Sequence, residues 1–354
     1  LTVWEWLYSP AYLGLPGEQD DFSPSRLTEG QIAWIREKVW DHDRLFSWLK
    51  RHGINSNYDM VHADLVVTLW LMAQEYRKRT GEVPDLFFRT PRAAWASSRI
   101  LMGIPVPKAS AVLARLSDVI SKELRGSEVF ERLADAVTAD FGMDLPWVHL
   151  QSEFWKLHME AFENWYLGDD VFIHTFGHLP HSGGKEGFLK REVPLAPAEE
   201  IRDMFRTLKQ RGYGIAIATG RSRAEMGIPF RMYHWEEEFD PAYIGTADEA
   251  AEAMKLYPGT NLDKPHPFTY DCALFGSKKG NYRGYIDGTF CLQPEDEAWV
   301  IGDSLSDVWG ARSAGTGMIG VLTGLEGKSA RAMFEEEKAE HIIERVTDVL
   351  DILK

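Results

Sequence analysis

The stretch WVIGDSLSDVWGARSAG, from Trp299 to Gly315, indicates the fold most directly. A short apolar run ends at Gly302, and Asp303 and Asp307 follow it at the start of a small-residue helical pattern. Carboxylates at the end of a buried strand suit Mg²⁺, which binds one or two protein carboxylates and takes water or phosphate oxygens as its other ligands. The alternative is structural, with Asp303 as a helix N-cap and Asp307 as a first-turn charge favoured by the helix dipole.

Strands and helices alternate throughout the C-terminal half of the chain. A helical pattern over 198–211 precedes the strand-like YGIAIATG of 213–220. The strand-like MIGVLTG of 318–324 precedes a helical pattern near 328–338, and HII at 341–343 precedes a last helix. Such alternation predicts an α/β fold with a doubly wound parallel sheet. In such a sheet, ligands bind beyond the carboxyl ends of the strands.

A second polar signal lies at the end of the strand predicted over 213–218. Thr219 follows this strand directly, and Gly220 and Arg221 come next. A hydroxyl and two backbone N–H groups at the opening of a helix can bind a phosphate oxygen. The alternative interpretation is a threonine N-cap followed by a turn glycine.

The third signal is Lys264 in DKPHPFTY. Pro265 and Pro267 hold the backbone in an extended form, so the lysine is rigidly placed. A lysine fixed near a carboxylate cluster would offset charge on a transferring phosphoryl group. The alternative is a surface lysine in a proline-rich loop.

Together the three signals resemble the sequence motifs of the haloacid dehalogenase superfamily. Thr219 matches its second motif, Lys264 its third, and Asp303 with Asp307 its fourth, and the resemblance covers about residues 190–354. It implies a Rossmann-like core with a helical C1-type cap domain inserted near the N-terminus. It also implies that Thr219 binds the phosphoryl group, that Lys264 offsets its charge and that Asp303 is a metal ligand. Asp307 would contact the metal or its water and restrain Lys264.

The family's first motif, DxD on the first strand, is missing from this chain. In the family its first Asp attacks phosphorus and its second is the general acid and base. Asp41 and Asp43 have the right spacing but continue a helical pattern, and GYIDGTF (284–290) has Tyr285 at the nucleophile position and reads as a turn in a hairpin-like insertion. Because the chain begins at Leu1 and LTVWEWLYSP suits the segment after motif one, we expect the nucleophile just upstream of Leu1. The chain as given would then be inactive alone.

The N-terminal half predicts a helical cap domain. Residues 1–25 read as irregular structure with room for one helical turn and are assigned to the core, 26–190 to the cap and 191–354 to the core. Helices are expected over the segments 58–79, 92–102, 109–124, 127–140 and 147–167. Candidate substrate contacts in the cap are the basic residues Arg89, Arg92, His174, His178, His181 and Lys185. The alternative is that the arginines are helix-surface charges and the histidines belong to a solvated hinge.

Composition limits the classes of partner. The formal net charge is -15, so a nucleic-acid partner is not expected, and the longest apolar stretch, 65–73, is too short to cross a membrane. Cys272 and Cys291 form no CxxC, which favours reduced thiols in a cytoplasmic protein. The oligomeric state is open.

The sequence therefore predicts a Mg²⁺-dependent phosphatase that hydrolyses a small phosphorylated metabolite through an aspartyl-phosphate. A dehalogenase of the same fold needs no metal, which the pair Asp303 and Asp307 argues against. A phosphomutase or phosphonatase needs specific cap groups that the sequence does not identify. A noncatalytic binding or scaffold protein that lacks the nucleophile is the alternative from another functional class.

Overall fold

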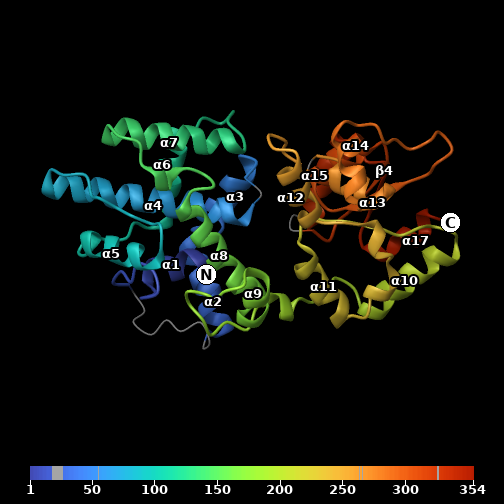
Figure 1. Ribbon diagram of the computed structural model, residues 1–354, viewed down its shortest axis with the longest axis horizontal. Coiled ribbons are helices and arrows are strands. Elements are labelled where there is room, and N and C mark those ends of the chain that lie inside the picture. Colours follow the sequence, from blue (N-terminus) through green and yellow to red (C-terminus); the bar gives the residue numbers. More distant parts are fainter. Residues whose placement is uncertain (18–26, 55, 263, 265, 325–326) are drawn as a thin grey trace. The chain divides into compact units, whose positions relative to one another are not determined.

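The computed structural model describes residues 1–17, 27–54, 56–262, 264, 266–324 and 327–354. The chain divides into two compact units, Leu1–Phe188 and Leu189–Lys354 (Figure 1). The division lies close to the cap boundary expected at residue 190. The two units are described separately below.

All the secondary-structure elements in the described residues of the N-terminal unit are helices. Its elements are α1 (Thr2–Tyr8), α2 (Glu29–Trp40), α3 (Arg44–Arg51), α4 (Asn57–Thr80), α5 (Pro91–Leu101), α6 (Ala109–Val119), α7 (Ser127–Phe141), η2 (Pro146–Val148), α8 (Glu153–Leu167) and α9 (Asp169–Phe176). Helix α4 runs through the middle of the unit and packs against α1, α5, α6 and α8. One continuous apolar core extends from Val3 to Ala161.

Local sequence signals set the ends of these helices. The Ser56 hydroxyl accepts from the Asp59 N–H and begins α4, which ends at Gly81 with a φ of 83°. The segment expected to be helical from 147 instead forms the short η2 turn, and α8 begins only after Gln151, whose φ is 60°. A non-glycine residue in the left-handed region interrupts a helix, which explains the late start.

The described part of segment 1–25 lies in the helical unit, whereas the sequence had suggested that it accompanies the C-terminal unit. Residues 2–8 form helix α1, about two turns long, in the segment where the sequence allows one helical turn. Trp4 and Trp6 are buried, and α1 packs against α4 and α8. Apolar burial therefore ties α1 to the helical unit.

The C-terminal unit alternates strands and helices. Its elements are α10 (Ala198–Gln210), β1 (Ile217–Ala218), α11 (Arg223–Met232), η4 (Glu236–Glu238), η5 (Pro241–Tyr243), β2 (Ile244–Gly245), α12 (Ala247–Leu256), α13 (Phe268–Phe275), η6 (Lys279–Asn281), α14 (Tyr282–Ile286), β3 (Trp299–Gly302), α15 (Leu305–Ala314), β4 (Gly317–Val321), η7 (Gly327–Ser329), α16 (Ala330–Glu336), β5 (His341–Ile343), η8 (Val346–Asp348) and α17 (Val349–Ile352). A short turn, η3 (Phe188–Arg191), spans the division between the units.

All described strand pairs are parallel. Strand β1 pairs with β2, and β3, β4 and β5 form a second sheet in that order. Helix α13 packs against β1, β2 and α15, while α15 packs against β3 and β4. The predicted α/β class, with parallel strands and a helical N-terminal part, is confirmed. The segment 284–290 is no hairpin, because α14 occupies its start and Tyr285 is buried against Phe268.

Within the described residues, no helix has both the length and the apolar character needed to cross a membrane.

Candidate active site

Lys264 connects the two-stranded and the three-stranded sheet at the carboxyl ends of their strands. Its ammonium donates to the backbone oxygen of Ala218, at the end of β1, at 3.1 Å. It also donates to Oδ1 of Asp307, in the first turn of the helix after β3, at 3.0 Å. Because β1 and β3 each end at this point, Thr219, Lys264, Asp303 and Asp307 are gathered at the edge where an α/β sheet binds its ligands.

Asp307 is the anchor of this cluster. Its Oδ1 accepts from Lys264 and from the Tyr270 hydroxyl, the latter at 2.8 Å. Its Oδ2 accepts from the backbone N–H groups of Asp303 and Ser304 and from the Ser304 hydroxyl. Burial favours a raised pKa for this carboxyl, but the Lys264 charge and the hydrogen bonds outweigh burial and the pKa is lowered. Asp307 is therefore ionised, and both of its oxygens are already engaged.

The structural alternative, in which the two aspartates cap a helix, holds for Asp307 but not for Asp303. Ser304, rather than Asp303, is the N-cap of α15, and Asp307 completes its capping box. Asp303 is left without a capping role. Its carboxylate has no hydrogen-bond partner among the described side chains, and Oδ2 faces Gly324, where an added Cβ would lie 2.3 Å away.

Asp303 fits a cation ligand by its chemistry. Although the residue is exposed, the surrounding protein and the charge of Asp307 raise the pKa of its carboxyl. An uncompensated carboxylate beside a second carboxylate favours a bound cation. The described residues contain no group of three or more His, Cys, Asp or Glu placed to hold a metal.

The phosphate-binding candidates Thr219, Gly220 and Arg221 form a loop after β1 that is fixed by hydrogen bonds. The Thr219 N–H donates to the Gly245 oxygen of β2, and the Thr219 hydroxyl oxygen accepts from the Arg221 N–H at 3.1 Å. Ser222 is the N-cap of α11, so Thr219 is not a cap residue. The Arg221 guanidinium makes a bidentate ion pair with Glu192, at 2.7 and 3.0 Å. Of the three residues, Thr219 and Gly220 are left with polar groups that can reach a ligand.

Sequence reasoning missed Tyr270. This residue lies on α13, donates its hydroxyl to Asp307 and places its ring 4.6 Å from the Lys264 ammonium. The ring lies against Gly310 of α15, where an added Cβ would be 2.2 Å from the Tyr270 Cε2 atom. An aromatic residue soon after Lys264 and a glycine one turn after Asp307 are the only sequence signals, and neither carries chemistry by itself.

The basic candidates of the helical unit lie in separate places. Arg89 and Arg92 are exposed at the start of α5. His178 and His181 lie on either side of Glu160, with ring nitrogens 3.8 and 3.6 Å from its carboxylate. His174 is exposed in the last turn of α9.

Lys185 is buried inside the helical unit. Its side chain is 1% exposed, and its ammonium lies 2.9 Å from Oε1 of Glu5. It also donates to the Asn164 side chain and the Ser182 backbone, both at 2.6 Å. These partners account for the charge and the donors of the ammonium, so in this arrangement Lys185 has a structural role.

Asp41 and Asp43 lie at the junction of α2 and α3. Both have left-handed backbone angles, and they pair with Arg44 and Arg36 respectively. The structure therefore places these carboxylates in a helix–helix turn of the N-terminal unit, and the described residues before them, 1–17 and 27–40, contain no strand.

Comparison with known proteins finds a family model that matches part of the C-terminal unit, and curated relatives that match part of the chain. Residues 261–349 match the family model described as HAD-hydrolase-like. The chain is 28% identical over 155 residues to the pyrophosphatase PpaX of Bacillus cereus strain B4264, and 27% identical over 155 residues to that of Bacillus thuringiensis strain Al Hakam. These alignments cover 44% of this chain and 58% of each relative, so the chain spans a little more than half the length of the curated relatives it matches.

A solved structure resembles nearly the whole chain. It is an X-ray structure of target ZR25 of the Northeast Structural Genomics Consortium, which is 27% identical in sequence and aligns with a TM-score of 0.80. The alignment covers 99% of this chain and 92% of that one.

Proposed function

Since the C-terminal unit is that of a haloacid dehalogenase-like hydrolase, we propose that the protein is a Mg²⁺-dependent phosphatase acting on a small phosphorylated metabolite. The observation that carries this proposal is the position of Lys264, which bonds to the end of β1 and to Asp307 at once. This places a hydroxyl, a cation and two carboxylates at one edge of the parallel strands, which are the groups that phosphoryl transfer requires.

Each residue has a definable role in binding the phosphoryl group. The Thr219 oxygen accepts from Arg221, so its own proton is available for a phosphoryl oxygen. The Gly220 N–H is a second donor beside it. The Lys264 ammonium has three N–H donors, and the Ala218 and Asp307 contacts leave one for the substrate. Together these groups would orient the phosphoryl group and offset its charge.

Asp303 would hold the Mg²⁺ ion, which when bound offsets negative charge on the phosphoryl oxygens. Asp307 would act through Lys264 and through the backbone of Asp303, since both of its oxygens are engaged. The role of Asp307 is thus to position the other two side chains.

We propose that the nucleophile lies on a strand between β1 and β3, encoded upstream of Leu1. Among the described strands, β1 pairs only with β2 and β3 only with β4, so each has an edge that can accept a further strand. A carboxylate at the end of that strand would attack phosphorus, form an aspartyl-phosphate and release the alkoxide. A second aspartate would protonate the alkoxide and then take a proton from the water that releases phosphate.

Two further parts of the proposal concern the substrate. The helical unit would act as the cap that excludes water during the reaction. Arg92, His174, His178 and His181 remain its candidate substrate contacts. Inorganic pyrophosphate is a second candidate substrate, because the curated relatives carry the name pyrophosphatase.

The test compares the chain from Leu1 with a longer protein that includes the residues encoded upstream. We expect the longer protein to hydrolyse p-nitrophenyl phosphate or pyrophosphate with Mg²⁺, and the shorter chain to show no turnover. Asp303→Asn should abolish the Mg²⁺-dependent turnover of the longer protein. Asp287→Asn, which removes an exposed ion pair with Arg283, should leave that turnover unchanged. Turnover by the shorter chain would contradict the proposal of an upstream nucleophile. Asp41 would then be the candidate nucleophile. Mg²⁺ binding without turnover by the longer protein would support a noncatalytic binding protein.

A further inference from the structure

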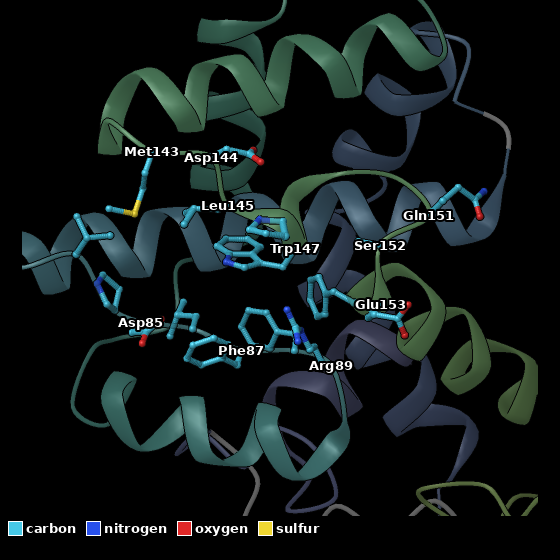
Figure 2. Close-up of a pocket in the computed structure, with 16 residues that line it drawn as sticks. Asp85, Phe87, Arg89, Met143, Asp144, Leu145, Trp147, Gln151, Ser152 and Glu153 are labelled. Carbon is cyan, nitrogen blue, oxygen red and sulfur yellow. The ribbon is translucent and has the colours of Figure 1, made fainter.

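The helical unit contains an open pocket that the proposed reaction does not use. Its volume is about 850 Å³. Three chain segments line it: 83–89 between α4 and α5, 143–147 from the end of α7 into η2, and 151–154 at the start of α8 (Figure 2). This volume is within the range of small-molecule sites. The pocket lies wholly within Leu1–Phe188, so it can be considered without reference to the C-terminal unit.

Aromatic rings make the inner surface of the pocket. Phe88 packs edge-on against Trp147, with ring centroids 5.5 Å apart, and tilts against Phe154 at 4.6 Å. All three rings are buried, so they are held in place by the core. Phe87 and Met143 stand on the outer wall and are about half exposed, at 52% and 50%. The pocket therefore offers a rigid apolar interior with an accessible mouth.

Some of the charged residues around this pocket have ion-pair partners and others do not. Asp144 pairs with His149 at 2.6 Å, and Glu153 pairs with Lys156 at 2.9 Å. Among the described residues, Arg89 and Asp85 have no ion-pair or hydrogen-bond partner. Figure 2 shows Arg89 between Phe87 and Glu153, whereas Asp85 lies with Met143 at the opposite end of the pocket from Gln151. Arg89 is thus a cation without a counter-ion next to the apolar interior.

We propose that this pocket binds a small organic anion, one with an aromatic or branched aliphatic body and a single carboxylate or sulfonate. The body would lie against Phe87, Phe88 and Trp147, and the anionic group would pair with the planar guanidinium of Arg89. Guanidinium binds such groups in a two-pronged geometry, and its weak hydration suits a partly apolar setting. Asp85, at the far end, sets the orientation by repelling the anionic group.

Three probes with the same body and different charge test this proposal on the full chain. They are 1-naphthoate, 1-naphthylmethanol and 1-naphthylmethylammonium, and isothermal titration calorimetry measures the dissociation constant of each. We expect naphthoate to bind most tightly and the ammonium probe most weakly. Arg89→Gln should weaken naphthoate binding by about tenfold, the loss expected from one charged hydrogen-bonded contact, and leave the alcohol unchanged.

Two further variants complete the experiment. Arg132→Gln removes another exposed arginine of the helical unit, one that does not line the pocket, and should change none of the three constants. Phe87→Ala should weaken all three probes, because it removes apolar wall. Circular dichroism melting shows that each variant is folded. Tighter binding of the ammonium probe, an Arg89→Gln effect no larger than that of Arg132→Gln, or no binding of any probe would overturn the proposal. None of these outcomes depends on the phosphatase activity.

Discussion

The hydroxyl of Tyr270 donates to the same oxygen of Asp307 that accepts from Lys264, at 2.8 and 3.0 Å respectively. One carboxylate oxygen thus joins α13, α15 and the loop that carries Lys264. Burial and the neighbouring charge of Asp307 raise the pKa of the Tyr270 hydroxyl, which keeps it protonated as a donor. Tyr270 is in this way a positioning residue for the lysine and the aspartate.

Tyr270→Phe should destabilise the chain by about 1–3 kcal/mol, because Asp307 would lose a hydrogen bond to a buried charge. Tyr282→Phe is the matched control, since its hydroxyl makes only a 3.4 Å contact with the Ser277 oxygen. Urea unfolding measures both changes. Equal effects of the two substitutions would show that the Tyr270 hydroxyl contributes nothing specific to Asp307.

Gly310→Ala should destabilise the chain, although alanine usually stabilises a helix relative to glycine. The added Cβ would lie 2.2 Å from the Tyr270 ring, so helix α15 or the ring must move, at a cost of about 1–3 kcal/mol.

Gly227→Ala in α11 is the control for this change. Its Cβ would meet the far end of the Arg231 side chain, which can move away. We expect unchanged or increased stability there, measured by the same urea unfolding. A stabilised Gly310→Ala variant would contradict the close packing of Tyr270 on α15.

Lys185→Met should destabilise the helical unit by about 3–5 kcal/mol, because it leaves the buried Glu5 carboxylate without its cation. Among the described residues, the hydrogen bond that the carboxylate would keep is the one from the Trp165 indole N–H to Oε2, at 2.8 Å. The double variant with Glu5→Gln should recover a large part of that loss. Thermal unfolding of the wild type, both single variants and the double variant gives the coupling between the two residues. Additive losses would argue against a tightly coupled buried pair.

The stability of the helical unit should fall as the pH falls below about 6.5, the ordinary pKa of histidine. His62 and His158 are fully buried and bonded to each other at 2.9 Å, and His62 also contacts the Val148 oxygen. A carbonyl only accepts, so His62 carries its proton on Nε2, and His158 donates to His62 Nδ1. Burial lowers the pKa of His62 to about 4. Burial and the neighbouring His62 lower the pKa of His158 well below the ordinary value of a histidine.

The sign of this effect follows from proton uptake. Between pH 6.5 and the lowered pKa values of the two rings, the unfolded chain binds protons that the folded chain does not. Each ring therefore lowers the free energy of unfolding by at most about 1.4 kcal/mol for each pH unit of acidification. Circular dichroism melts from pH 7.5 to 5 measure the slope. His158→Phe should flatten it, and His149→Gln, at an exposed ion pair, should not. A slope unchanged by His158→Phe would mean that other groups control the acid response.

Several features of the site could be predicted from the sequence because their chemistry is local. Thr219 and Asp303 each directly follow a strand, and a residue at that position must lie at the carboxyl edge of a parallel sheet. Lys264 was predicted from the prolines beside it, and the structure brings it to Asp307. Pro265 itself lies outside the described residues. Helix α4 was predictable in the same way, because capping signals and apolar spacing act within one segment.

Tertiary structure alone decided the contacts between distant segments. Tyr270 meets Gly310, and Lys185 meets Glu5, because packing brings together side chains that are 40 and 180 positions apart. No local pattern distinguishes Lys185 from a solvated lysine, and only burial among Glu5, Asn164 and Ser182 shows its role. The pocket beside Arg89 likewise arises from three separate loops. The sequence thus determined which groups stand at strand and helix ends, since backbone geometry sets those positions, while packing determined which side chains are buried, paired or left open to a ligand.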